Sequence, residues 1–348
     1  MRKLKIAQIA PLWYPIPPRK YGGIERIISF LTEELTRRGH KVTLFAAKTS
    51  ETKAKLLSVA KDGIISLGAS WSDYWWNCFN HSFAFEKAGY FDLIHCHWEI
   101  LGSFFQKFCK TPVLYTLHNI PKSSDLKWQI YEYYKNDLNI VFISKSEKNN
   151  CPVKFKNNWV IYNGIDVSSF NFNPKPQEHF VWIARISEAK GTKEAIQIAK
   201  RSGVKLLLAG QIQEHHKDYF KKEIKPRLGP KIEYLGELPR KKISDFYAKA
   251  KGCLYPIKWE EPFGLVMAES MACGTPVIVF DRGSAREVVK DGKTGFIVKN
   301  IDEAVEAVKK IDQIKRGDCR KWVEDNFSLE KMVDEYEKVY YKLLERKK

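Results

Sequence analysis

Short apolar runs alternate with longer amphipathic segments along the whole chain. In the first half, runs with the length of buried strands occur at residues 4–10, 41–47, 92–97, 112–118 and 140–144. Residues 23–39, between the first two runs, have apolar side chains at helical spacing and end at Gly39, a typical helix C-cap. This alternation of strands and helices predicts a parallel sheet that helices cover on both faces.

The pattern is interrupted at residues 171–178, which contain two prolines and no apolar periodicity and are interpreted as a linker. Strand-like runs then return at 180–186, 204–210, 231–238, 253–257 and 275–280. We therefore expect two α/β domains, an N-terminal one at 1–170 and a C-terminal one at 179–326. Residues 327–348 predict a helix of about 20 residues that packs back toward the N-terminal domain.

The length and the charge refine this picture. A chain of 348 residues suits two domains. Its net charge of +18 is spread evenly, with 23 basic and 14 acidic residues up to Phe170 and 36 and 27 after it, or +9 for each part. An even spread argues against a basic nucleic-acid-binding arm. Two interpretations stay open: solvated lysine-rich faces, or attraction to phosphorylated substrates and acidic membrane lipids.

Cysteine usage and hydropathy bear on the compartment. The seven cysteines include no C-x-x-C pair, which is typical of reduced thiols in a cytoplasmic protein. The first apolar run is too short for a signal peptide, and no run reaches the roughly 18 apolar residues of a membrane span. We expect a cytoplasmic protein. The positive charge adds a second interpretation, peripheral contact with the inner face of the membrane.

Parallel sheets bind ligands beyond the carboxyl ends of their strands, and two such domains facing each other would form a cleft. In the N-terminal domain, Gly22 and Gly23 directly precede a helix, where free N–H groups can receive a phosphate or sugar oxygen. The alternative is a flexible turn. His118 ends a strand and is either a structural group or a hydrogen-bond donor and proton shuttle. His95 and His97 lie on one side of a strand, but without a third ligand they predict no metal site.

In the C-terminal domain two cations lie near one strand end. Arg185 follows the strand at 180–186, and Lys190 stands at the entrance of the next helix. Two cations five residues apart suit a diphosphate, although such a pair is also common on surfaces. Residues 291–295 contain the Gly-Lys-Thr of a phosphate loop without its first glycine and precede a strand-like FIV, so they are interpreted as a turn.

The stretch EPFGLVMAE places a glutamate at each end of an apolar run, Glu261 in a loop and Glu269 in a helix expected at 263–273. Pro262 suits the helix start, and Gly264 leaves room for a ligand to reach the first free N–H groups. Those donors belong to Gly264, Leu265 and Val266. Glu269 accepts hydrogen bonds from neutral hydroxyls, or else it extends outward or bonds a backbone amide.

The motifs along the chain follow one another in the order of a known family. They are P-x-x-x-Y-G-G-I-E, T-L-H-N, I-Y-N-G-I-D, A-R-I-S-E-A-K-G, Y-L-G-E-L, E-P-F-G-L-V-M-A-E and D-G-K-T-G-F-I-V. With Glu261 and Glu269 as an E-x₇-E motif, the chain resembles the retaining glycosyltransferases of family 4 over nearly its full length. The resemblance implies the GT-B fold, with two Rossmann-like domains facing across a cleft and a C-terminal helix crossing between them. One departure is Ala184, where the family usually has glycine before Arg185.

The resemblance also implies a role for each matching residue. Arg185 and Lys190 would hold the donor diphosphate, Glu261 would contact the donor sugar, and Glu269 would bind the ribose. The amides of Gly264, Leu265 and Val266 would lie near the phosphates and sugar. Gly22 and Gly23 would approach the donor phosphates or the acceptor, and His118 would touch the donor sugar near the reacting carbon. The expected catalytic residues are thus His118, Arg185, Lys190 and Glu261.

The implied reaction moves a hexose from a nucleotide-sugar, a UDP-sugar first and a GDP-sugar next, to an acceptor hydroxyl with retention. No cofactor or metal is expected, since families of this fold use cationic side chains and helix dipoles, and the sequence contains no D-x-D. The product would belong to glycan, glycolipid or cell-envelope synthesis. The alternatives are an epimerase or phosphorylase of the same fold, or a non-enzymatic basic protein that binds sugar or nucleic acid.

The acceptor, a sugar or a lipid-linked sugar, is expected to meet the N-terminal domain. Its candidate residues are His97, Trp98 and Glu99. The nearby tryptophans at 71, 75 and 76 would stack on sugar rings or enter a lipid interface, or else pack inward from a helix.

Overall fold

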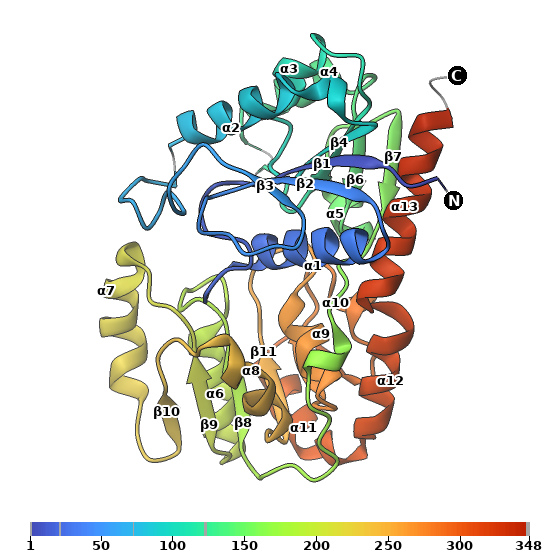
Figure 1. Ribbon diagram of the computed structural model, residues 1–348. Coiled ribbons are helices and arrows are strands. Elements are labelled where there is room, and N and C mark those ends of the chain that lie inside the picture. The colour runs from blue at the N-terminus through green and yellow to red at the C-terminus, as the bar shows by residue number, and fades with distance from the viewer. Residues whose placement is uncertain (1, 21, 72, 122–123, 346–348) are drawn as a thin grey trace. The chain divides into compact units, whose positions relative to one another are not determined.

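The computed structural model describes residues 2–20, 22–71, 73–121 and 124–345. The chain folds into two compact units, Met1–Gly164 with Leu329–Lys348 and Ile165–Ser328 (Figure 1). Each unit is a Rossmann-like α/β fold built on one parallel sheet. The chain therefore leaves the first unit once and returns to it for its last helix.

The first unit contains a seven-stranded sheet in the order β3-β2-β1-β4-β5-β6-β7, with every neighbouring pair parallel. Its strands are β1 Lys5–Ile9, β2 Lys41–Phe45, β3 Lys55–Leu57, β4 Leu93–Cys96, β5 Val113–Leu117, β6 Asn139–Phe142 and β7 Asn157–Val160. The five predicted strands are confirmed. The other two, β3 and β7, form the sheet's edges, where half-buried residues lack the apolar run by which a central strand is recognised.

The second unit contains a six-stranded parallel sheet in the order β10-β9-β8-β11-β12-β13. Its strands are β8 Phe180–Ile183, β9 Leu206–Ala209, β10 Ile232–Tyr234, β11 Gly252–Tyr255, β12 Val277–Phe280 and β13 Gly295–Val298. Each was predicted, β13 from its FIV, and residues 292–294 before it form the expected turn.

Helices cover both sheets. Those of the first unit are α1 Gly23–Arg37, α2 Trp75–Phe85, α3 Ser103–Gln106, α4 Lys127–Tyr134, α5 Lys145–Asn150 and α13 Leu329–Glu345. Those of the second unit are α6 Thr192–Ser202, α7 Lys217–Tyr219, α8 Arg240–Ala248, α9 Leu265–Ala272, α10 Ala285–Val288, α11 Ile301–Lys310 and α12 Arg316–Asn326. The central strands β4 and β5 are buried along their whole length, as two covered faces require.

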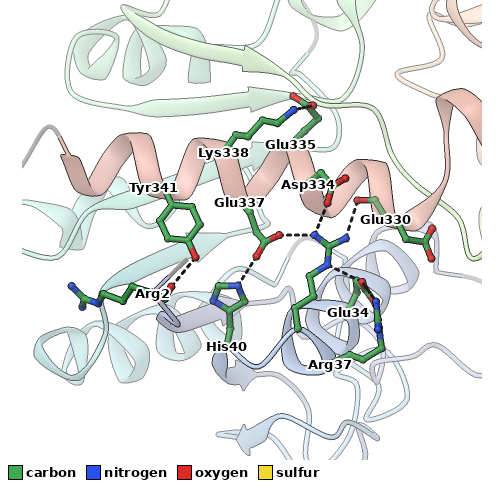
Figure 2. Close-up of polar contacts among 11 residues, drawn as sticks. Arg2, Glu34, Arg37, His40, Glu330, Asp334, Glu335, Glu337, Lys338 and Tyr341 are labelled. Atoms are coloured by element: carbon green, nitrogen blue, oxygen red, sulfur yellow. Dashed lines mark hydrogen bonds and ion pairs between the residues drawn. The ribbon is translucent and has the colours of Figure 1, made fainter.

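The last helix, α13, packs into the first unit through an apolar stripe. The stripe consists of Met332, Val333, Tyr336, Val339, Tyr340 and Leu343, all buried. Beside it, Arg38 bonds Asp334 and Glu337 of α13, each at 2.5 Å, and Glu34 of α1 at 2.8 Å (Figure 2). Arg38 is only 18% exposed, and Glu337 and Glu34 are 18% and 5% exposed, so these two pairs are better shielded from solvent than ordinary surface pairs.

The segment 171–178 has no helix or strand, and its backbone packs onto the second unit. The Asn171 N–H donates to Ser244 Oγ at 2.7 Å, and Arg316 Nε donates to the Asn173 carbonyl at 2.6 Å. The boundary between the units lies earlier than the sequence suggests, between Gly164 and Ile165.

Candidate functional site

In the first unit, the polar side chains at the carboxyl ends of β4 and β5 meet in the interior. His97 follows β4 and His118 follows β5, and His97 Nδ1 lies 3.2 Å from His118 Nε2. Burial lowers the pKa of His118 to about 3 and that of His97 well below its ordinary value. Both imidazoles are therefore neutral at physiological pH.

Further buried groups extend this pair to the last helix. His97 Nε2 bonds Gln8 Oε1 at 2.6 Å, and Gln8 Nε2 donates to Tyr340 Oη at 3.2 Å. Tyr340 Oη also lies 2.8 Å from Nδ1 of His95, whose Nε2 lies 2.7 Å from Thr116 Oγ1. His95 and His97 thus have hydrogen-bonding roles within the protein. Across the described ranges no three His, Cys, Asp or Glu side chains gather as a metal-binding group.

Trp98 and Glu99, the other acceptor candidates, lie at an aromatic cluster. Trp98 is buried, with ring centroids 5.3 Å from Trp13 and 5.1 Å from Tyr74. Glu99 has a φ of 45° and forms an ion pair of 3.2 Å with Lys127. A left-handed conformation costs about 1 kcal/mol for a residue other than glycine. The loop therefore holds Glu99 beside the aromatic rings at some conformational cost.

The three tryptophans of residues 71–77 behave differently from one another. Trp71 packs on Trp13 with a centroid distance of 5.1 Å. Trp75, the first residue of α2, is 84% exposed, so the interpretation that these aromatic side chains all pack inward is wrong. Trp76 is 37% exposed. Ser72 lies outside the described residues.

Gly22 and Gly23 begin α1, as expected: Gly22 is the N-cap and Gly23 the first helical residue. Tyr21, which precedes them in the motif, lies outside the described residues. Two residues further on, Glu25 is buried, and within the described part of the chain its Oε1 has no hydrogen-bond partner. Burial raises the pKa of Glu25 to about 7. A sequence reading misses this carboxyl because glutamate in a first helical turn is ordinary.

In the second unit, Glu261 is the centre of a set of donors. Its Oε2 accepts from Lys190 Nζ at 2.6 Å, Tyr255 Oη at 2.7 Å and Trp259 Nε1 at 2.9 Å. The Lys190 ammonium also lies 4.6 Å from the Trp259 ring centroid. Both charged side chains are nearly buried, at 12% and 11% exposure. One carboxylate oxygen thus takes all three bonds, and Lys190 is held in a fixed place.

The turn before α6 brings Lys190 to this position. Gly191 adopts a φ of 70°, and a Cβ there would come within 1.9 Å of the Pro256 carbonyl oxygen. The Lys258 N–H donates to the Ala189 carbonyl at 2.9 Å. The loop after β8 therefore packs directly on the loop after β11, which bears Glu261.

Helix α9 begins later than predicted. Its first residue is Leu265 rather than Phe263, because Gly264 adopts a left-handed φ of 79° that a continuous helix excludes. Pro262 therefore lies in the preceding loop and is not the first helical residue. This φ favours glycine, since an L side chain rarely adopts it. The N–H groups of Leu265 and Val266 belong to the first turn, where a helix lacks internal acceptors.

Glu269 is buried in α9 and forms an ion pair of 3.2 Å with Arg240 at the start of α8. It therefore neither extends outward nor lies among apolar groups alone. Arg185 donates from Nη1 to Gln213 Oε1 at 3.1 Å. Gln213 follows β9 and Glu261 follows β11, with β8 between these strands. The two predicted cations thus flank the end of β8, Arg185 toward β9 and Lys190 toward β11.

Several residues that form these polar groups were not predicted from the sequence. They are Gln8, Thr116, Tyr336 and Tyr340 in the first unit and Gln213, Arg240, Tyr255 and Trp259 in the second. Trp259 directly precedes EEP in a strand-end loop, and that position was a usable signal. The tyrosines of α13 lie in its apolar stripe, and a stripe does not reveal where a hydroxyl points.

Comparisons with known proteins bear on the class of protein. Residues 21–169 match the sequence model described as Glycosyltransferase Family 4, and residues 167–328 match that described as Glycosyl transferases group 1. An uncharacterized glycosyltransferase of Methanocaldococcus jannaschii is 26% identical, over 87% of this chain and 88% of its own. A probable sucrose-phosphate synthase of Thermosipho melanesiensis is 23% identical, over 72% and 70%.

Solved structures share the fold. A sucrose-phosphate synthase from Thermosynechococcus elongatus has a TM-score of 0.82 at 19% identity and covers 99% of this chain and 100% of its own. Anabaena HepE, crystallised with UDP and glucose, has a TM-score of 0.78 at 17% identity, covering 97% and 99%. Two Rossmann-like units, matched in turn by two glycosyltransferase family models, make this chain a glycosyltransferase of the GT-B type.

Proposed function

We propose that the protein transfers a hexose from a nucleotide-sugar to an acceptor hydroxyl with retention at the anomeric carbon. The observation that carries the proposal is the arrangement of Lys190 on Glu261, held by Tyr255 and Trp259. Such a group offers a fixed cation for a phosphate and a fixed carboxylate for a sugar hydroxyl. A UDP-sugar is the first candidate donor and a GDP-sugar the second. The crystal structures of Anabaena HepE with UDP and with UDP-glucose support this order.

The donor binds the second unit in this proposal. Lys190 and Arg185 hold the two phosphates from either side of the end of β8. The amides of Gly264, Leu265 and Val266 contribute donors at the start of α9, where the helix dipole favours an anion. The buried Glu269 accepts the ribose hydroxyls while Arg240 balances its charge.

Departure of the nucleoside diphosphate is the step that this arrangement assists. Negative charge grows on the leaving phosphate as the glycosidic bond breaks, and Lys190 and Arg185 stabilise it without a proton transfer. Glu261 binds a donor-sugar hydroxyl, so it does not serve as a glycosidase-type nucleophile. The acceptor hydroxyl attacks from the face that the leaving group vacates, and its proton passes to the departing phosphate. No metal or cofactor takes part in this proposal.

The first unit contributes the remaining groups. His118 lies near the reacting carbon as a neutral hydrogen-bonding group, and Gly22 and Gly23 approach the donor phosphates or the acceptor. His97, Trp98 and Glu99 form the acceptor side. Trp98 contributes to this side by supporting Tyr74, whose 44% exposed ring stacks on the buried indole and is of the kind on which sugars stack. The acceptor is a sugar or lipid-linked sugar of a glycan, glycolipid or cell-envelope component.

We also place the protein in the cytoplasm, with peripheral contact to acidic lipid at the inner membrane face. Helices α2, α3 and α4 lie together at the top of the view in Figure 1. These helices and their flanks expose large apolar side chains. These are Tyr74, Trp75, Phe79, Phe104, Phe108, Leu126 and Tyr133. The net charge of +18 adds attraction to anionic headgroups. None of the helices in the described ranges has the length and hydropathy of a membrane span.

A donor screen followed by product analysis tests the proposal. UDP-, GDP- and ADP-sugars are added to the full chain, and the true donor should raise the melting temperature most, since it binds only the folded state. That donor is then incubated with candidate acceptors, and NMR of the product should show the donor's anomeric configuration. An inverted product would overturn retention. Epimerised sugar without transfer, or phosphate-dependent sugar release, would point to the epimerase or phosphorylase. Salt-sensitive nucleic-acid binding without nucleotide-sugar binding would favour the non-enzymatic alternative.

A further inference from the structure

Seven buried groups of the first unit form one continuous hydrogen-bonded chain. It runs from His118 through His97, Gln8, Tyr340, His95 and Thr116 to Tyr336. Every member is at most 9% exposed. The chain therefore connects the end of β5 to two tyrosines of α13 without passing through solvent.

The order of protons along this chain follows from the chemistry of its members. A neutral imidazole has one donor and one acceptor nitrogen, and an amide oxygen only accepts. Because Gln8 Oε1 faces His97 Nε2 at 2.6 Å, His97 must carry its proton on Nε2. Its Nδ1 is then an acceptor, so the neighbouring His118 Nε2 must donate.

The other half of the chain is consistent with this order. Gln8 Nε2 donates to Tyr340 Oη, which leaves the Tyr340 proton for Nδ1 of His95. His95 then donates from Nε2 to Thr116 Oγ1, and the Thr116 hydroxyl donates to Tyr336 Oη at 2.9 Å. Each of the five groups between His118 and Tyr336 donates once and accepts once along the chain, and such chains strengthen cooperatively.

We propose that Gln8 and Tyr340 are positioning residues that hold the proton of His118 on Nε2 and leave the Nδ1 lone pair to accept a hydrogen bond from a substrate hydroxyl. The proposal rests on the proposed function only in that a substrate meets His118. Reversing the Gln8 amide would reverse every donor in the branch toward His118 and place its proton on Nδ1. The orientation of one amide thus decides which nitrogen of His118 is basic.

Ion pairs and hydrogen bonds hold α13, and with it Tyr340, in place. Arg38 of the α1 C-terminus ties α13 to α1 through Asp334 and Glu337, on the helix that also bears Tyr336 and Tyr340. His40 adds a bond of 2.7 Å from Nε2 to Glu337, with its Nδ1 accepting from the Leu4 N–H at 3.1 Å. In this proposal α13, the last helix, thus influences the tautomer of His118 through Tyr340.

The test measures the tautomer of His118 directly. Long-range ¹H–¹⁵N correlation spectra of the full chain, assigned with a His118→Gln variant, should show a protonated Nε2 and an unprotonated Nδ1. Tyr340→Phe keeps the ring and removes the hydroxyl, and it should give a mixture of tautomers. Turnover should fall about tenfold, a loss typical of removing an orienting partner, with KM nearly unchanged.

Tyr341→Phe is the matched control. It makes the same change one residue later, where the hydroxyl donates to the Arg2 carbonyl at 2.7 Å, outside the chain (Figure 2). It should leave both the tautomer and the turnover unchanged. If Tyr340→Phe fails to fold, Gln8→Leu and Gln8→Glu give the same comparison. Leucine removes the acceptor for His97. A glutamate oxygen retains that acceptor, so Gln8→Glu should preserve the proton on Nε2 of His118.

Two results would overturn the proposal: a proton on His118 Nδ1 in the unaltered protein, or an unchanged tautomer in both Tyr340→Phe and Gln8→Leu. Failure of the proposed function would look different. In that case the tautomer would respond as expected, while no nucleotide-sugar would be turned over.

Discussion

The strand ends of the two units share an architecture and differ in chemistry. In the first unit the central strands bear buried neutral imidazole, amide and hydroxyl groups that bond one another, and the ion pair of Glu99 with Lys127 lies outside this set. In the second unit the loops and helices that follow the strands bear charges, and two ion pairs lie among them: Lys190 with Glu261, and Glu269 with Arg240.

This difference indicates a division of labour that the fold alone does not specify. A cation that a carboxylate holds in a fixed place can also form a charge-assisted hydrogen bond to a phosphate, which suits a diphosphate. A neutral hydrogen-bonded chain gains nothing from an anion, but it can orient hydroxyl groups with high directional precision. In the proposed function, the same parallel-sheet edge thus serves two kinds of recognition, according to the side chains near each strand end.

The largest expected effect comes from removing the fixed charge of the second unit. Lys190→Ala should lower kcat/KM by about 10²- to 10³-fold, because the leaving phosphate loses a preorganised partner. Lys258→Ala is the control, since Lys258 lies on the same loop surface, is 37% exposed and pairs with Glu188 and Glu194. Steady-state kinetics of both variants give the two kcat/KM values to compare with that of the unaltered protein. Near-native rates for Lys190→Ala would show that the diphosphate binds elsewhere.

The next effect concerns Glu25, a buried ionisable side chain in the first unit, outside the neutral chain that runs from His118 to Tyr336. Burial raises its pKa to about 7, so between about pH 4.5 and 7 the folded state binds more protons than the unfolded state. Stability should therefore fall as pH rises through this range. Glu25→Gln removes that loss and should be more stable than the unaltered protein at pH 8 by about 3 kcal/mol.

Unfolding of both proteins at pH 5 and pH 8 measures this difference. The buried Glu147, whose pKa burial raises to about 8, contributes a similar slope to both proteins, so only their difference is informative. Glu86→Gln, at a side chain that is 61% exposed, should change nothing. An equal pH slope in Glu25→Gln and the unaltered protein would mean that Glu25 is solvated.

The smallest expected effect tests the neutrality of the first unit. His118→Ala should lower turnover about tenfold to a hundredfold, as loss of one hydrogen-bonding group does. With a pKa of about 3, His118 stays neutral above that pH, so kcat/KM should show no His118 titration between pH 5 and 8.

The control for this prediction is His179→Ala, because His179 precedes β8 at the opposite end of that strand from the candidate site. A rate limb near pH 6.5 that disappears in His118→Ala would show that the imidazole is solvated and charged. That result would remove the contrast between the two units.

The sequence by itself determined the two parallel sheets, because a central strand buried on both faces must be a continuous apolar run. It also determined where polar residues interrupt those runs, at His118, Arg185, Lys190 and Glu261, since strand ends are where a parallel sheet exposes its loops. The edge strands β3 and β7 were not predicted, because a half-buried strand has no such apolar run.

Only the tertiary structure decided which of these groups meet. Gln8 and Tyr340 are 332 positions apart, one inside an apolar strand and the other in the stripe of a helix, and neither position suggests a polar contact. Arg240 likewise reaches Glu269, 29 positions away, only because α8 and α9 pack together. Hydrophobic periodicity records which face of an element is buried, whereas the pairing of buried polar atoms depends on how separate elements pack, and no local pattern encodes that.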